Sequence, residues 1–255
     1  MTLGGWYRAH GRHDLAWRST SDRWSVLVSE VMLHQTQVSR VATAWAAFIG
    51  AFPTPEAMAA TDAGAVIKAW DRLGYPRRAR RLWGAAHRIA RDGWPDDLTE
   101  LPGVGRYTAA AVRAQADGDD VAAVEVNVRR VVERVRGRRL TEIEAERAMI
   151  AAGRPLRGRN RLLALMDLGA LVCRPRLPRC RDCPLRRSCV SRGARPEERR
   201  ARQAPFEGSF RQRRGRVLAS LRAGPADVGE LDGDALRSLA VDGLAVVDGA
   251  RARLP

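Results

Sequence analysis

Lysine is almost absent from this chain of 255 residues, in which Lys68 is the only one. A reaction that needs a lysine amine as its nucleophile therefore has almost nowhere to find one. The other strong cations are arginines, and 45 Lys+Arg against 29 Asp+Glu give a formal net charge of +16. Such an excess of positive charge favours a polyanionic partner, and nucleic acid is the leading candidate.

Long apolar runs are also missing. An anionic membrane surface is therefore a weaker candidate than nucleic acid, and no membrane partner is expected. The N-terminal residues 1–14 lack the apolar core of a secretory signal, so a cytoplasmic, nucleoid-associated protein is expected. The hydrophobic fraction of 45% is ordinary for a globular protein, and the length suffices for one large domain or two modest ones. We expect a monomer.

Residues 21–115 are patterned as a series of short helices. The stretch 21–52 is apolar at helical spacing, and Ser21 or Asp22 can cap its start. Three further helices are predicted after it, with starts at Pro55 just after Thr54, at a capping Thr61 and at residue 78. Because few segments alternate as strands do, the predicted fold class is mostly α.

A change of composition marks the C-terminal part of the chain. The stretch 191–204 is polar, charged and nearly devoid of large apolar residues, which is typical of a linker. Over 205–255 the pattern predicts two helices and a hairpin that turns at Asp248 and Gly249. This order predicts a small winged-helix-like module, with a small structural cap as the alternative.

All the cysteines lie in one segment, CRPRLPRCRDCPLRRSC. Cys173, Cys180, Cys183 and Cys189 have six, two and five residues between them. A disulfide framework is not expected without an export signal, and a catalytic thiol does not need three neighbours. The segment 173–189 therefore predicts a metal centre with four thiolates. The spacing leaves structural zinc and an iron–sulfur cluster both open.

A glycine-rich turn precedes a helix-forming run in LPGVGRYTAAAV, residues 101–112. Its glycines allow backbone amides to approach an anion closely at a helix N-terminus. The pattern predicts a helix-hairpin-helix grip on the DNA backbone, and such a grip carries no sequence information. The residues of this grip are Gly103, Val104, Gly105 and Arg106.

Several motifs occur in a family-specific order: LAWR (15–18), SEVMLHQTQV (29–38), LGYPRRARRL (73–82), LPGVGRYTA (101–109), VEVNVRRV (124–131), MDLGALVC (166–173) and the cysteines. Over residues 12–190 the chain resembles the helix-hairpin-helix DNA glycosylases of the endonuclease III superfamily, most closely the MutY-type adenine glycosylases. The resemblance implies a two-lobed α-helical core over 1–190 that acts on double-stranded DNA with a mismatch or damaged base. It also implies a 4Fe-4S cluster held by Cys173, Cys180, Cys183 and Cys189.

The resemblance also implies roles for single residues. Glu30 matches the general acid that protonates the departing adenine, and its apolar neighbours are expected to raise the pKa of its carboxyl group. Gln35 matches the residue that wedges into the base stack, and His34 stands where a second glutamine is usual. The residues that match the adenine pocket are Leu15, Trp17, Arg18 and Asp167, for which core packing or a buried ion pair is the alternative.

Tyr107 occupies the position of the Schiff-base lysine in bifunctional endonuclease III enzymes. Since Lys68 is the only lysine, the resemblance implies a monofunctional glycosylase. Tyrosine at this position also occurs in mismatch thymine glycosylases, so it does not choose between the two substrates.

The segment VEVNVRRV contains the chief departure from the family pattern. From the residues alone it is a half-buried strand or a helix start with polar side chains facing water. By resemblance, Glu125 stands in place of a catalytic aspartate that stabilises an oxocarbenium-like sugar cation, and Asn127 keeps the neighbouring amide. The longer side chain moves the carboxylate by about 1 Å, which can cost roughly a hundredfold in rate, although the charge is retained.

A second departure is the short C-terminal part. Residues 206–255 are too few for the nucleotide-hydrolase-like domain that reads 8-oxoguanine opposite adenine in MutY-type enzymes. The predicted reaction is hydrolysis of the N-glycosidic bond of a mispaired or damaged base, namely adenine opposite 8-oxoguanine or guanine. One alternative is a glycosylase for another base, such as mismatched uracil or thymine, which Glu125, His34 and the short tail favour. The other is a weakly catalytic DNA-binding protein, which the retained Glu30 and Asn127 oppose.

Overall fold

The computed structural model describes residues 1–193 and 204–255. Most of the predicted linker lies outside these residues. Within them, no helix has the length and apolarity that a membrane span requires. The chain forms two compact units: Met1–Glu30 with the described part of Val104–Ala201, and Val31–Gly103 with the described part of Arg202–Pro255. The predicted domain boundaries at 190 and 205 stay a prediction.

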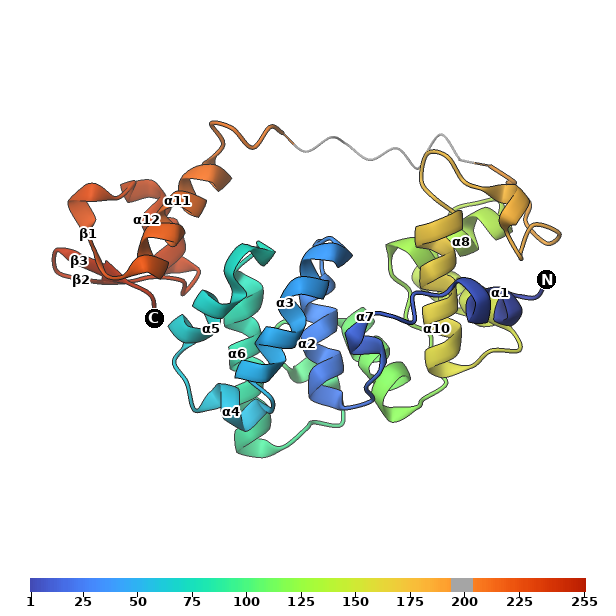
Figure 1. Cartoon of the computed structure of the whole chain (residues 1–255), viewed down its shortest axis with the longest axis horizontal. Coiled ribbons are helices and arrows are strands. Elements are labelled where there is room, and N and C mark those ends of the chain that lie inside the picture. Colours follow the sequence, from blue (N-terminus) through green and yellow to red (C-terminus); the bar gives the residue numbers. More distant parts are fainter. Residues whose placement is uncertain (194–203) are drawn as a thin grey trace. The chain divides into compact units, whose positions relative to one another are not determined.

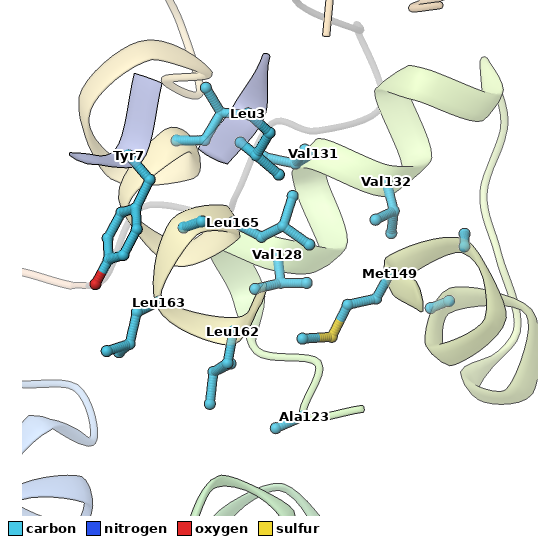
Figure 2. Close-up of a cluster of buried hydrophobic side chains, with 14 of the residues drawn as sticks. Leu3, Tyr7, Ala123, Val128, Val131, Val132, Met149, Leu162, Leu163 and Leu165 are labelled. Atoms are coloured by element: carbon cyan, nitrogen blue, oxygen red, sulfur yellow. The ribbon is translucent and has the colours of Figure 1, made fainter. Parts of the chain in front are cut away.

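The first unit is a bundle of helices. Its elements are α1 (Leu3–His10), η1 (Ala16–Arg18), α2 (Arg23–Leu33) as far as Glu30, α7 (Arg106–Val112), the π-helical η4 (Arg113–Asp117), α8 (Val126–Arg136), α9 (Glu142–Gly153), α10 (Gly158–Asp167), the π-helical η5 (Leu168–Val172) and the 3₁₀ turn η6 (Cys180–Asp182). Helices α8, α9 and α10 pack on one another, and α1 packs on α10. Figure 2 shows the buried side chains between them, among them Leu3, Val128, Val131, Met149, Leu162 and Leu165.

The second unit begins with a group of short helices, seen in blue to green in Figure 1. They are the end of α2, α3 (Val38–Ala51), α4 (Pro55–Ala59), α5 (Ala63–Trp70), η2 (Asp71–Leu73), α6 (Arg77–Asp92) and η3 (Leu98–Glu100). Thr54 caps α4, with Pro55 in its first turn, as predicted. The cap of α5 is Asp62 and not Thr61, since the Asp62 carboxylate accepts from the N–H of Ala65.

The apolar stretch 21–52 forms two helices, α2 and α3, and not one continuous helix. The chain leaves α2 through Gln35, whose φ of 55° is left-handed. The guanidinium of Arg78 donates to the carbonyl oxygens of Val31 and Met32, at 2.6 and 2.9 Å. The last carbonyls of a helix lack partners in their own helix, so Arg78 satisfies two that the break leaves open.

The C-terminal part of the second unit contains α11 (Phe210–Ala223), η8 (Val228–Glu230), α12 (Gly233–Val241) and the strands β1 (Ala226–Asp227), β2 (Val246–Asp248) and β3 (Arg251–Arg253). The strands form an antiparallel sheet in the order β1-β3-β2. The predicted hairpin turn follows Asp248, where Gly249 has a φ of 55°. This part docks on the short helices, because the Pro255 carbonyl accepts from the N–H of Gly64 at 2.7 Å and Arg77 pairs with Asp242 at 2.8 Å.

Candidate active site and cysteine pocket

Glu30 is a buried residue of α2, and both oxygens of its carboxylate accept hydrogen bonds. Its residue exposure is 4%. The Tyr107 hydroxyl, from α7, donates to Oε2 at 2.9 Å. The side-chain amide of Gln115, from η4, donates to Oε1 at 2.7 Å. Residues far apart in the sequence therefore fix the orientation of one carboxyl group.

The surroundings of Glu30 favour its protonated form. Burial raises the pKa of this carboxyl, and the negative charge of Glu125 acts in the same direction. The hydrogen bonds from Gln115 and Tyr107 and the charge of Arg18 lower the pKa but do not cancel the effect of burial. Burial and the charge of Glu30 also raise the pKa of Tyr107 well above its ordinary value, so this phenol stays neutral. A protonated carboxyl group of this kind can act as a general acid.

Glu125 lies directly before α8 and caps its N-terminus. Its carboxylate accepts from the backbone N–H groups of Asn127 and Val128, at 2.7 and 2.9 Å, and from Nδ2 of Asn127 at 3.0 Å. The segment VEVNVRRV is thus a helix start and not a strand, and the carboxylate is not turned to bulk water as the polar-surface interpretation expected. Burial raises the pKa of Glu125, against the lowering effect of these N–H donors.

Arg130 connects Asn127 to the cysteine segment. Its guanidinium donates to Oδ1 of Asn127, to the carbonyl oxygen of Gly169 and to the carbonyl oxygen of Cys173, each at 2.7 Å. A Cβ on Gly169 would meet the Cβ of Asn127 at 2.7 Å, so the glycine allows this close approach. The side chain of Asn127 is therefore held between Glu125 and Arg130.

The residues predicted to line a base pocket form a buried ion-pair network. Asp167, at the end of α10, is fully buried and pairs with Arg18 and Arg12, each at 2.6 Å. Burial would raise the pKa of Asp167, but the hydrogen bonds and charges of the two arginines hold it below its usual value. Trp17 is buried and Leu15 is half-buried. The ion-pair alternative accounts for Asp167 and Arg18, and a role in base binding stays a prediction.

His34 and Gln35 belong to the second unit, where α2 ends. His34 is half-buried, and burial together with the charge of Arg78 lowers its pKa, so the imidazole is neutral. Gln35 is exposed.

Tyr75, before α6, is 48% exposed with a left-handed φ of 48°. The cation–π contact with Arg78, whose guanidinium lies 5.5 Å from its ring, holds this aromatic side chain at the surface.

The predicted DNA grip is a solvent-facing turn. Gly103 has a φ of 83°, and a Cβ there would lie 2.9 Å from the Cβ of Arg81, so only glycine fits. Gly105 is the N-cap residue of α7 with no side-chain cap and with open space around a Cβ. Val104 is buried, and the Arg106 side chain is 76% exposed. The turn therefore offers free backbone N–H groups and a cation on the same segment.

The four cysteines line one pocket in the first unit. The whole pocket, which Arg134 and Val172 also line, measures about 320 Å³ with open solvent included. No disulfide joins the four cysteines, and Arg134 donates to Sγ of Cys173 at 3.3 Å while its carbonyl accepts from Sγ of Cys189 at 3.4 Å. The six arginines of the same segment are exposed: Arg174, Arg176, Arg179, Arg181, Arg186 and Arg187.

The donor set of this pocket suits a metal centre with thiolate ligands. Among the described residues, no three His, Cys, Asp or Glu side chains converge closely enough to hold a single metal ion. Four thiol sulfurs around one shared space are the donor set of an iron–sulfur cluster. Burial and the neighbouring cysteines raise the pKa of Cys183 to about 11, so its thiolate form needs a positively charged centre beside it.

Gln115 and Arg130 are the site residues to which the sequence assigned no role. Arg130 stood inside a motif, and its position three residues after Asn127 on a helix predicts that the two side chains are neighbours. Gln115 lies outside every quoted motif. The one feature of the sequence that could have pointed to Gln115 is a polar amide within an apolar helical run.

A family model described as "HhH-GPD superfamily base excision DNA repair protein" matches residues 28–154. Among known proteins, an adenine DNA glycosylase of Mycobacterium tuberculosis is 43% identical, over 90% of this chain and 81% of that protein. The human adenine DNA glycosylase is 33% identical, over 82% of this chain and 42% of that protein.

Solved structures extend the similarity to the fold. A thermostable thymine-DNA glycosylase superposes with a TM-score of 0.68 and 28% identity, over 74% of this chain and 93% of that chain. An endonuclease III–DNA complex superposes with a TM-score of 0.63, over 74% and 92% of the two chains. At 22% identity, the latter similarity concerns the fold alone.

Proposed function

The chain belongs to the adenine DNA glycosylases of the HhH-GPD superfamily of base excision DNA repair proteins, and we propose that it hydrolyses the N-glycosidic bond of adenine opposite 8-oxoguanine or guanine. The observation that carries this proposal is the pair of carboxylates in the first unit. Glu30 is buried with a raised pKa and accepts hydrogen bonds from side chains, whereas Glu125, whose pKa burial also raises, is held by backbone N–H donors at the start of α8. Two carboxyl groups in different environments can divide the acid and the charge-stabilising roles.

Glu30 supplies the proton in this mechanism. As the bond between the sugar C1′ and the base nitrogen breaks, its electron pair stays on the base, and the base takes the Glu30 proton. Tyr107 holds Oε2 of Glu30 in place, and its raised pKa keeps it neutral throughout. Positioned proton transfer of this kind typically contributes about 10²–10⁴ in rate.

Glu125 stabilises the positive charge that develops on the sugar. Its carboxylate is fixed by Asn127 and Val128, so it does not reorganise during the reaction. Water then adds to C1′ and gives a proton to the ionised Glu30, which leaves an abasic site, free adenine and Glu30 again in its acid form. Because Tyr107 stands at the position of the Schiff-base lysine, no covalent amine intermediate forms and the DNA strand is not cut.

Backbone contacts bind the duplex. The turn Gly103–Arg106 presents N–H groups and a cation to a phosphate, and Gln35 and His34 enter the base stack where adenine leaves it. Leu15, Trp17, Arg18 and Asp167 form the wall of the adenine pocket. The exposed arginines of the segment 173–189 add sequence-independent attraction to DNA.

Cys173, Cys180, Cys183 and Cys189 would hold a 4Fe-4S cluster, which as a bound group crosslinks the loop of residues 173–189. Arg134 stabilises the negative sulfurs and also donates to the carbonyl oxygens of Arg174 and Pro175. The loop thereby keeps its arginines in a fixed arrangement. The part of the chain over 205–255, with α11, α12 and three short strands, is a winged-helix-like module. We further infer that the protein acts as a monomer in the cytoplasm, on the nucleoid.

A glycosylase for mismatched thymine or uracil is the second candidate. It is supported by the 28% identity to a thymine-DNA glycosylase and by Glu125 in place of aspartate. The tyrosine at position 107 is compatible with this second substrate. A DNA-binding protein with little catalysis is less well supported, because Glu30 has both a raised pKa and a fixed orientation.

A panel of duplexes, each with one mismatch or lesion, tests the proposal through abasic sites revealed by alkali. Adenine opposite 8-oxoguanine or guanine is the expected substrate, with no strand cleavage before alkali. Release of thymine or uracil alone would favour the second candidate, and cleavage without alkali would contradict the monofunctional assignment.

A further inference from the structure

Gln115 is buried beside Glu30 but has no part in the mechanism described above. Its residue exposure is 4%, and its side-chain nitrogen lies 2.7 Å from Oε1 of Glu30. Its backbone is held as well, because Arg159 donates to the Gln115 carbonyl oxygen at 2.7 Å. The amide is therefore fixed against the carboxylate by its side chain and by its main chain.

The helix that carries Tyr107 changes its winding before it reaches Gln115. In a regular α-helix, a residue eight positions further on lies about 80° away around the axis. The turn Arg113–Asp117 is π-helical, with more residues per turn, so each residue advances by a smaller angle. Gln115 thereby returns toward the face of Tyr107, and both side chains reach Glu30.

The two donors differ in what they can do. A phenol can donate or accept a hydrogen bond, whereas an amide nitrogen can only donate. Facing the ionised carboxylate of Glu30, the amide of Gln115 presents its nitrogen to Oε1. In a protonated carboxyl group the carbonyl oxygen accepts such a bond better than the hydroxyl oxygen does. When Glu30 is protonated, the Gln115 donor therefore favours the proton on Oε2, where the Tyr107 hydroxyl can turn to accept it.

We propose that Gln115 is a positioning residue that holds Oε1 of Glu30 and keeps the transferable proton on Oε2, the oxygen shared with Tyr107. This inference rests on the proposed glycosylase function, in which Glu30 is the acid. The charged or titratable groups that face Glu30 are Tyr107 from α7, Glu125 from the start of α8 and Arg18 from η1. Gln115 adds to them a neutral donor, which fixes geometry and not net charge.

The test compares wild type with Gln115→Met, which keeps the length and removes the amide, by single-turnover adenine excision across a pH series. A hydrogen bond to the ionised carboxylate favours ionisation, so its loss raises the pKa of Glu30. The alkaline limb of the rate should move up by roughly one pH unit. The plateau at lower pH should fall about tenfold or more, because the acid loses its orientation.

Two further variants complete the design. Gln115→Asn retains an amide that is too short to reach, so it should behave as the Met variant does, and it serves if Gln115→Met does not fold. Gln212→Met makes the same substitution in α11, where Gln212 accepts from the N–H of Gly208, and it should leave both limb and plateau unchanged. A lowered rate at every pH without movement of the limb would mean that Gln115 is merely structural, and would overturn the proposal.

A second readout separates this inference from the proposed function. Carboxyl groups of ¹³C-labelled glutamate are titrated by NMR without DNA, and Glu30 is identified by the signal missing in Glu30→Gln. The Glu30 pKa should be higher in Gln115→Met than in wild type. An unchanged Glu30 titration would overturn the role of Gln115 even in an active enzyme. A protein that releases no adenine but shows the shift would contradict the function alone.

Discussion

The carboxylate of Glu125 accepts two hydrogen bonds from Asn127, one from its backbone N–H at 2.7 Å and one from its side-chain amide at 3.0 Å. Together with the bond from Val128, these contacts make the glutamate the cap of α8. The same group is therefore a structural cap and the second carboxylate of the candidate site. Its distance from the reacting sugar is then set by the start of a helix and by the length of one side chain.

Glu125→Asp should increase adenine excision. Aspartate is a preferred N-cap residue, so α8 keeps its start, while the carboxylate moves by about 1 Å toward the position expected for the family. Glu125→Gln should be slower than both, because it keeps the length and loses the charge. Single-turnover rates for the three proteins measure this order. If another base is the natural substrate, wild type should be fastest on that base, and equal rates on every duplex would assign no chemistry to Glu125.

Gly105→Val should weaken binding to all duplexes alike without unfolding the protein. A Cβ at Gly105 has no heavy atom within 4 Å, so the added side chain meets DNA and not the protein. Gly103→Val is the contrast, because its left-handed φ and the contact with Arg81 should destabilise the fold itself. Wild-type affinity should fall by about three orders of magnitude between 50 and 200 mM salt. A flat salt titration would contradict the backbone grip.

Asp167→Asn should lower the free energy of unfolding by about 3–5 kcal/mol, because it leaves two arginines without their buried partner. Asp117→Asn is the matched control. It breaks the pair with Arg23, which is partly exposed, and should cost about 0–1 kcal/mol. Chemical denaturation of the three proteins at neutral pH provides the comparison, and equal losses would contradict the buried network.

The ion pairs of Asp167 with Arg12 and Arg18 also predict how the stability of the fold changes at acid pH. In the folded protein the pKa of Asp167 is held below its ordinary value of 3.8. The contribution of Asp167 to the free energy of unfolding is therefore complete above that pH and is lost as the pH falls through the folded pKa. Wild type should therefore lose its advantage over Asp167→Asn only below pH 3.8. An advantage that disappears at higher pH would contradict the lowered pKa.

The purified protein should be yellow-brown and contain iron. Cys183→Ser should lose the colour and the iron together, because Cys183 lines the pocket with the three other cysteines. Metal analysis and visible absorbance measure this result. One zinc per chain and no iron would contradict the cluster.

The sequence predicted those elements that depend on local signals. Thr54 with Pro55 marked the start of α4, and Asp248 with Gly249 marked the hairpin turn, because cap and turn chemistry act within a few residues. The break between α2 and α3 was not predicted, since the side chain that satisfies the freed carbonyls, Arg78, comes from a distant helix.

In the candidate site too, local signals and motifs were predictable and contacts made by distant residues were not. Family motifs pointed to Glu30 and Tyr107, and the structure brings them within 2.9 Å of each other. For the segment around Glu125 the sequence left a strand and a helix start both open, and the backbone makes Glu125 the N-cap of α8. Gln115 could not be predicted, because a π-helical turn and not its sequence spacing carries it to Glu30.

The most direct test of the account is the release of free adenine from a duplex with adenine opposite 8-oxoguanine, by wild type and Glu30→Gln under single-turnover conditions. The amide keeps the shape of the side chain but cannot supply the proton. Wild type should release adenine, and the variant should be slower by about 10²-fold or more while it binds the duplex with similar affinity. Excision by Glu30→Gln at the wild-type rate would contradict the account.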